Sequence, residues 1–285
     1  MTETTREPRN TGGAIAKAAA GKAAVKSERA TMQAAINKMM PQIIRALPKH
    51  LDGERFTRMF LTQISVNPAL AKCTFESTMG AVMQVAQLGL EVGPLGEAYL
   101  IPYSNNKERR MECQLQLSYK GLLTLLYRSG QAVSVQAQTV HENDEFSYEL
   151  GLHPDLKHIP ARSNRGSAIA YYAVVNLKDG GFLFEVMSRE DVENHAKRYS
   201  QSYGKSASPW SGDSFDSMAK KTVLKRCLKY APLSATLMRQ MAADGAVKTE
   251  LAPDMTEIAG TYVVDDDTGE VVVEVDAPAE SEVGN

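Results

Sequence analysis

The stretch Ala168-Ile-Ala-Tyr-Tyr-Ala-Val-Val-Asn-Leu177, followed by Lys178-Asp-Gly180 and Gly181-Phe-Leu-Phe-Glu-Val-Met187, decides the fold class. Its two halves are rich in β-branched and aromatic residues, which pack well on a pleated sheet. The Asp-Gly pair between them supplies the backbone freedom that a tight turn requires. We therefore predict an antiparallel hairpin across residues 168–187.

Two segments upstream show the same strand signature. Apolar residues at Cys113, Leu115, Leu117 and Tyr119 alternate with polar ones, which predicts a strand with one face toward water. Residues 133–139 alternate in the same way, and residues 97–103 follow a glycine-rich turn into a further strand. A short helix over 120–128, ending at Gly130, is predicted to separate the first two of these segments.

Helical patterns lie on both sides of the strands. Residues 31–47 repeat apolar side chains at helical spacing, although Pro41 is expected to kink or divide the helix. Further helices are predicted after the caps Asp52, Thr74 and Ser188, after Asp213 or Ser214, and over residues 234–243. The order of elements predicts an α+β fold, with a mostly antiparallel central sheet flanked by helices.

Composition divides the chain into three parts. Residues 1–30 are rich in small and basic residues and predict a flexible, disordered basic arm. Residues 31–245 predict one folded domain that is helical over 31–90, sheet-containing over 97–187 and helical over 188–243. Residues 250–285 carry 11 acidic side chains and no Lys or Arg, which predicts an acidic mobile C-terminal tail.

The formal net charge of −2 conceals this division. Without the tail, basic residues exceed acidic ones by nine. A positive body favours a polyanionic partner, and the tail would then modulate binding. A tail that only improves solubility explains the charge division equally well.

Several classes of protein are disfavoured by the sequence. The longest apolar stretches are far shorter than the roughly 20 residues of a membrane helix. Residues 1–10 mix charges and lack the apolar core of a signal peptide, so we expect a cytoplasmic protein. Cys73, Cys113 and Cys227 are widely spaced, which favours core residues over a disulfide framework or a zinc site.

Catalytic motifs are not found. The chain contains no GxxxxGK[ST] phosphate loop, no GxSxG and no HExxH, and we expect neither a cofactor nor a metal. The acidic group Glu142, Asp144, Glu145 and Glu149 leaves a magnesium-dependent nuclease as an alternative, although a solvated loop explains it better. We therefore predict a binding protein rather than an enzyme.

The most informative segment is His195–Tyr230, where eight basic residues face two acidic ones. Lys221, Lys225 and Lys229 would form one row along a helix, and their mutual repulsion is better explained by a bound anion than by a solvated face, which is the alternative. Ala219, Val223 and Cys227 would dock the opposite flank. The eight basic residues are Lys197, Arg198, Lys205, Lys220, Lys221, Lys225, Arg226 and Lys229.

Aromatic residues accompany these charges, among them Trp210, the single tryptophan of the chain. Basic groups for phosphates and flat rings for bases suit single-stranded nucleic acid, although Trp210 serves equally well as a core anchor. A second basic patch, Lys107, Arg109 and Arg110, precedes Tyr119, Lys120 and Arg128.

A series of short motifs extends in order across roughly residues 35–235. They are residues 87–91 (QLGLE), 98–103 (AYLIPY), 116–121 (QLSYKG), 128–130 (RSG), 184–188 (FEVMS), 209–210 (PW), 218–222 (MAKKT) and 229–232 (KYAP). Together they resemble the RecT family of phage and prophage single-strand annealing proteins. Ala231 departs from the larger aliphatic residue more usual in the family. Neither the arm nor the tail matches reliably.

The resemblance implies an ATP-independent protein that coats single-stranded DNA, forms homo-oligomeric rings or helical filaments, and anneals complementary strands in recombination through an annealed duplex intermediate. It also implies a companion 5′ to 3′ exonuclease, with a host single-strand binding protein as a further partner. Residues 114–128, including Gln114 and Gln116, and residues 220–229 resemble the DNA groove of the family. A passive single-strand protector without annealing activity remains the main alternative.

Overall fold

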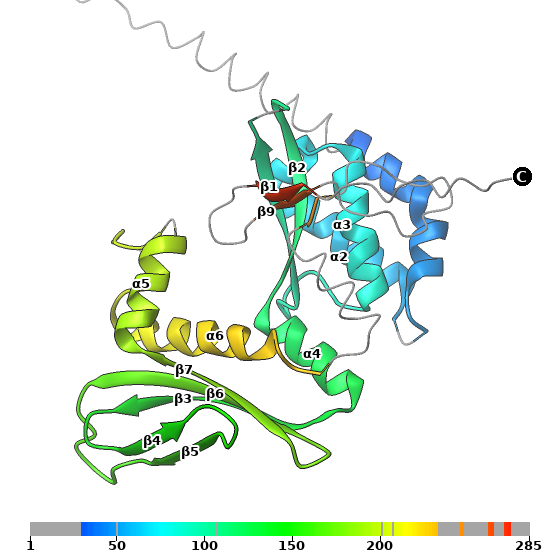
Figure 1. The fold of residues 1–285 in the computed structure, drawn as a ribbon. Helices are drawn as coiled ribbons and strands as arrows, with labels where there is room; N and C mark the ends of the chain where they lie inside the picture. The colour runs from blue at the N-terminus through cyan, green and yellow to red at the C-terminus, as the bar shows by residue number, and fades with distance from the viewer. Residues whose placement is uncertain are drawn as a thin grey trace, which may run out of the picture.

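The computed structural model describes residues 30–49, 51–106, 108–200, 202–206 and 208–232, and three short strands nearer the C-terminus. Figure 1 shows a helical part beside a long hairpin, and below it a sheet crossed by a helix. All strands in the described segments pair antiparallel. The predicted α+β class is therefore confirmed, with the strands divided among several small sheets.

The helical part contains a helix over residues 30–46, which Pro41 does not divide, followed by α2 (Gly53–Val66), the 3₁₀ helix η1 (Pro68–Lys72) and α3 (Phe75–Leu88). Asp52 caps α2 by accepting the Arg55 N–H at 2.8 Å. The last turn of α3 ends at Gly89, whose φ of 63° belongs to the left-handed region. The predicted caps at Asp52 and Thr74 are confirmed.

The long hairpin pairs β1 (Ala98–Asn105) with β2 (Arg110–Leu117). The prediction that one face of the β2 strand is exposed to water is wrong, because Glu112 and Gln114 are only 0% and 5% exposed. Glu112 is buried because it accepts hydrogen bonds from Arg110 and Asn105. The strand also ends earlier than predicted, since Ser118 caps the next helix, α4 (Tyr119–Ser129).

The hairpin predicted at residues 168–187 is confirmed as β6 (Ala168–Leu177) and β7 (Phe182–Ser188). It forms a sheet with β3 (Ala132–His141) in the order β3-β6-β7. Tyr171 points to one face of this sheet, where its hydroxyl donates to Asp216 of α6 (Phe215–Leu228) at 2.6 Å. Tyr172 points to the other face and stacks on Phe146, so a second hairpin packs there.

That second hairpin, β4 (Glu145–Glu149) and β5 (Asp155–Ile159), replaces the predicted polar loop at residues 142–149. The chain returns from β7 through α5 (Arg189–Tyr199), whose predicted Ser188 cap is confirmed and is completed to a capping box by Asp191. The 3₁₀ helix η2 (Gly212–Ser214) then leads into α6. Of the predicted alternatives Asp213 and Ser214, Ser214 occupies the N-cap position of α6, but its side chain makes no capping hydrogen bond.

Near the C-terminus, β8 (Ala246–Val247), β9 (Tyr262–Val264) and β10 (Val271–Glu274) form a small sheet in the order β10-β9-β8. The backbone of β8 lies beside β2 and α3. Three predicted segments lie outside the described residues. They are the helix over 234–243, residues 1–29 of the basic arm, and the acidic tail apart from β9 and β10.

Candidate nucleic-acid interface

A cleft lies where the end of β2 and the start of α4 meet α6. Two groups of basic residues that are distant in the sequence converge on it: Lys120 from α4, and Lys221 and Lys225 from α6. None of the nine residues that line the cleft is acidic. They are Gly96, Tyr99, Gln116, Leu117, Ser118, Tyr119, Lys120, Lys221 and Lys225.

The start of α4 is fixed by Ser118. Its Oγ accepts the N–H groups of Lys120 and Gly121 at 3.1 and 3.2 Å, and donates a short hydrogen bond to the Gly96 carbonyl. Gly121 allows the helix to approach the preceding turn, because a Cβ there would stand 2.3 Å from the Glu97 carbonyl oxygen. The first turn of α4, with Lys120, is therefore held rigidly against residues 96–97.

The opposite wall is a helix whose position is set by packing. Ala219, Val223 and Cys227 on one flank of α6 are buried, as predicted, and dock it on the sheet. Lys221 and Lys225 stand one helical turn apart and line the cleft. Figure 1 shows α6 running along the sheet toward α4, so the two walls come from elements that are far apart in the sequence.

The electrostatics of this cleft favour an anion. Three ammonium groups add to the positive end of the α4 macrodipole, which contributes about half a unit charge. The hydroxyl of Tyr119 and the side-chain amide of Gln116 lie beside them and offer neutral hydrogen bonds. Such a set of donors suits phosphate oxygens, without the bidentate geometry that reads individual bases.

Five of the predicted DNA-binding residues therefore meet in one place: Gln116, Tyr119, Lys120, Lys221 and Lys225. Lys197, Arg198 and Lys205 are exposed but do not line the cleft, and the same holds for Arg109 and Lys229. Lys220, half-buried on α6, also lies outside the lining. Lys107 lies outside the described residues.

Other predicted residues have structural partners. The Arg128 guanidinium donates to the carbonyls of Leu88 and Gly89 at 2.9 and 3.1 Å, at the end of α3. Arg110 pairs with buried Glu112 at 2.6 Å, and Arg226 pairs with Glu185 of β7 at 2.8 Å.

Two predicted contacts with DNA lie partly or wholly in the core. Gln114 is buried within β2. Trp210 is half-buried and packs edge-to-face on Phe215, with ring centroids 5.8 Å apart, which fits its alternative as a core anchor.

The sequence interpretation missed Tyr99, Gly96 and Ser118. Tyr99 stands in β1, where Ala98 and Leu100 are buried and Tyr99 itself is exposed. This alternation appears in the burial and not in the sequence, because residues 98–101 (AYLI) are all apolar and nothing in that pattern distinguishes Tyr99. Ser118 was interpreted as a strand residue, although a serine directly before a helical pattern is a cap signal.

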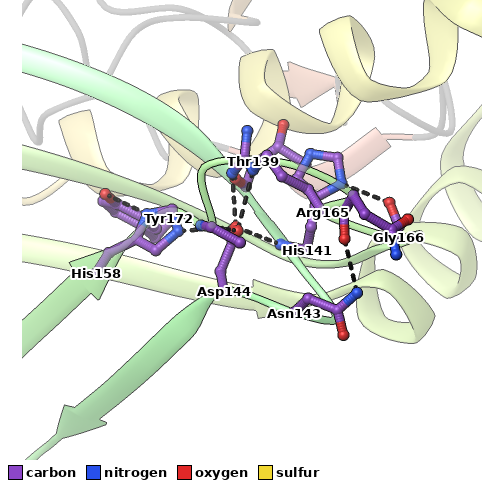
Figure 2. Close-up of polar contacts among 10 residues, drawn as sticks. Thr139, His141, Asn143, Asp144, His158, Arg165, Gly166 and Tyr172 are labelled. Carbon is purple, nitrogen blue, oxygen red and sulfur yellow. Dashed lines mark hydrogen bonds and ion pairs between the residues drawn. The ribbon is translucent and has the colours of Figure 1, made fainter.

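The acidic group considered for a metal site has a different role. Asp144 has a fully buried side chain that accepts from both Nε and Nη2 of Arg165, at 3.0 and 2.6 Å. It also accepts the N–H groups of His141 and Ala161, and His158 Nε2 lies 3.0 Å away (Figure 2). The Arg165 guanidinium and these hydrogen bonds hold the pKa of Asp144 well below its usual range.

The carboxylate of Asp144 is thus occupied by protein donors. Within the described segments, no group of three or more His, Cys, Asp or Glu side chains is placed to hold a metal ion. Burial raises the pKa of the Cys73 and Cys227 thiols to about 12, so neither is a nucleophile at neutral pH. No helix among the described residues has both the length and the apolar character needed to cross a membrane.

Comparison with known proteins assigns the family. The profile of the RecT family matches residues 54–258, well over half of the chain. The chain belongs to the RecT family. It is 39% identical to Protein RecT of Escherichia coli (strain K12) over 236 residues, which cover 81% of this chain and 86% of that protein. It is also 27% identical to the uncharacterized protein YqaK of Bacillus subtilis (strain 168) over 264 residues, 90% of this chain and 87% of that protein.

Family membership confirms the resemblance inferred from the motifs and gives the functional class, a DNA-binding protein of recombination by single-strand annealing. The match includes β1, β2, α4 and α6, so both walls of the cleft belong to the RecT region of the chain.

Proposed function

We propose that this protein binds single-stranded DNA through the cleft between α4 and α6 and anneals complementary strands without ATP or any covalent reaction. The observation that carries this proposal is the convergence of Lys120, Lys221 and Lys225 on one cleft, whose lining among the described residues includes no acidic side chain. RecT family membership supports the annealing activity.

The mechanism follows from charge. Two DNA strands repel each other through their phosphates, and lysines that neutralise one backbone lower that barrier to approach. Contacts to phosphates leave the base edges open, so a second strand can test for pairing. Base pairing then supplies the free energy of annealing, and we expect little sequence preference.

We further propose that the protein acts as a homo-oligomer, a ring or filament, in the cytoplasm. A companion 5′ to 3′ exonuclease would expose the strand, and a host single-strand binding protein would share the same DNA. These partners rest on family membership alone.

The interface is tested by changing Lys221 and Lys225 together to Ala. Each lost phosphate contact lowers the slope of log affinity against log salt by about 0.7 for a single strand. We expect weaker oligonucleotide binding and a slope reduced by roughly 1.4. The matched control is Lys72→Ala with Lys178→Ala, which removes the same charge from exposed positions outside the cleft. Equal effects of the two double variants would contradict the interface.

The activity is tested by mixing two complementary labelled oligonucleotides with the protein and no ATP. Annealing faster than the protein-free rate is expected. Binding without faster pairing would support the passive single-strand protector instead. Magnesium-dependent loss of full-length oligonucleotide would indicate the nuclease alternative, which the protein partners of Asp144 already disfavour.

A further inference from the structure

Tyr99 is the exposed aromatic ring of the cleft. The residue is 47% exposed and shares the cleft lining with Lys120, Lys221 and Lys225. The other lining aromatic, Tyr119, is half-buried and packs against the core. Trp210 packs on Phe215, and the exposed Tyr230 lies outside the lining. One flat ring therefore stands open beside the phosphate-binding groups.

The backbone beneath this ring is rigid. Tyr99 pairs with Gln116 in the β1–β2 hairpin, and its neighbours Ala98 and Leu100 are buried. The Tyr99 hydroxyl lies over Gly96. A Cβ at position 96 would stand only 2.7 Å from the Tyr99 hydroxyl oxygen, so the glycine makes room for it. Gly96, with φ of 65°, also accepts the Ser118 hydroxyl through its carbonyl. The ring and the start of α4 are thus positioned by the same turn.

We propose that Tyr99 forms a nucleobase subsite, on which one base of the bound strand stacks while lysines of the cleft hold the adjoining phosphate. This inference rests on the proposed function and adds the part of the nucleotide that the lysines do not contact. A single strand presents open base faces, whereas a duplex stacks them against each other. Tyr99 therefore favours single strands over duplex.

Stacking also suits annealing. It uses the face of the base and leaves its Watson–Crick edge open to a second strand. Every base has such a face, so stacking tolerates any sequence. Once the strands pair, the base stacks in the duplex and the contact with Tyr99 is lost, which helps to release the annealed product.

The test compares Tyr99→Ala, Tyr99→Phe and the unchanged protein on an oligonucleotide of roughly ten nucleotides, a length that one single-strand-binding module covers. Tyr99→Ala is expected to weaken binding about tenfold, because a stacked base contributes roughly that much. The salt slope should not change, since no phosphate contact is lost. Tyr99→Phe keeps the ring and should bind like the unchanged protein.

Two controls separate stacking from loss of structure. Tyr148→Ala removes a tyrosine of matching exposure, 46%, from the β4–β5 hairpin and should leave binding unchanged. An oligonucleotide built entirely of abasic residues offers phosphates but no bases, so the unchanged protein and Tyr99→Ala should bind it equally. Thermal unfolding should give the same Tm for the unchanged protein and for Tyr99→Ala.

A fluorescent base reports the contact directly. The fluorescence of 2-aminopurine in the oligonucleotide should change on binding to the unchanged protein and to Tyr99→Phe, and much less with Tyr99→Ala. If Tyr99→Ala matches the unchanged protein in affinity and fluorescence, the subsite is refuted, even where the Lys221 and Lys225 variant confirms the interface. If that lysine variant has no effect, the proposed interface itself fails.

Discussion

Asp144 illustrates how one residue can change meaning between sequence and structure. Its sequence neighbours Glu142 and Glu145 suggested either a solvated loop or a metal site. In the fold, Arg165 and His158 enclose its carboxylate, and the ring of His158 connects it to the Tyr172 hydroxyl (Figure 2). This cluster fastens the base of the β4–β5 hairpin to the sheet, which matters because an isolated two-stranded hairpin is only marginally stable.

Asp144→Asn is therefore expected to lower the Tm by several degrees, because it leaves the Arg165 guanidinium without its counter-charge. Since the folded-state pKa of Asp144 is below its unfolded value of about 3.9, its stabilisation is complete above that value and is lost as pH falls through the folded pKa. The difference from the unchanged protein should be constant between about pH 7 and 5 and shrink in stronger acid.

Denaturant unfolding across this pH range measures the effect. Asp155→Asn, at an exposed position of the same hairpin, is the control and should change stability by no more than about 0.5 kcal/mol. Equal stabilities of Asp144→Asn and the unchanged protein at pH 7 would show that the cluster does not support the hairpin.

At the scale of elements, α4 connects the two parts of the molecule. Its first turn forms one wall of the cleft, and Arg128 in its last turn bonds the carbonyls that end α3. A cation at a helix C-terminus also interacts favourably with the macrodipole. The helix thereby holds the cleft in a fixed position relative to the helical part.

Arg128→Ala is expected to destabilise the protein by about 1–2 kcal/mol, because two charge-assisted hydrogen bonds to α3 are lost. Since both bonds face protein carbonyls, the salt slope of DNA binding should stay the same. Denaturant unfolding and oligonucleotide titration measure the two quantities. A reduced slope with unchanged stability would instead place Arg128 on the DNA. Arg109→Ala, in the exposed β1–β2 turn, provides the stability control.

At the scale of the whole molecule, opposite charges are separated along the chain. Basic residues line the cleft, and acidic residues accumulate from Glu250 onward. The strands β9 and β10 lie in this acidic segment and form a sheet with β8, which lies beside β2. In the chain, the acidic segment follows β8, the strand that lies beside the hairpin carrying Tyr99. We expect its charge to compete with DNA for the cleft.

Truncation after Lys248 is expected to tighten oligonucleotide binding at low salt, with the gain fading at high salt as screening shortens the range of the charges. The control changes Asp265, Asp266 and Asp267 together to Asn, which lowers the charge and keeps the sequences of β9 and β10. If charge competition is responsible, this variant shows part of the gain. Affinity that stays constant after truncation would leave the tail with no role in DNA binding.

Much of the local structure was predictable from short-range chemistry. The Asp-Gly turn, the caps Asp52, Thr74 and Ser188, and the glycines that end α3 and α4 act within a few residues of chain. The predictions were wrong where contacts with residues distant in the sequence determine the burial or the secondary structure. Glu112 is polar in sequence but buried, because Arg110 and Asn105 satisfy its carboxylate. The β4–β5 hairpin depends on Tyr172 and Arg165, which come later in the chain.

The sequence by itself determined the α+β class, the family and the supply of basic residues, because periodicity, motifs and charge are properties of the chain. Only the tertiary structure decided which basic residues act together. Lys120, Lys221, Lys225 and Tyr99 share one cleft because α6 docks across the sheet toward α4. Arg110, Arg128 and Arg226 lie outside that cleft and bond to Glu112, the end of α3 and Glu185. Each basic side chain has the same charge in sequence, and its surroundings in the fold determine whether that charge can meet DNA.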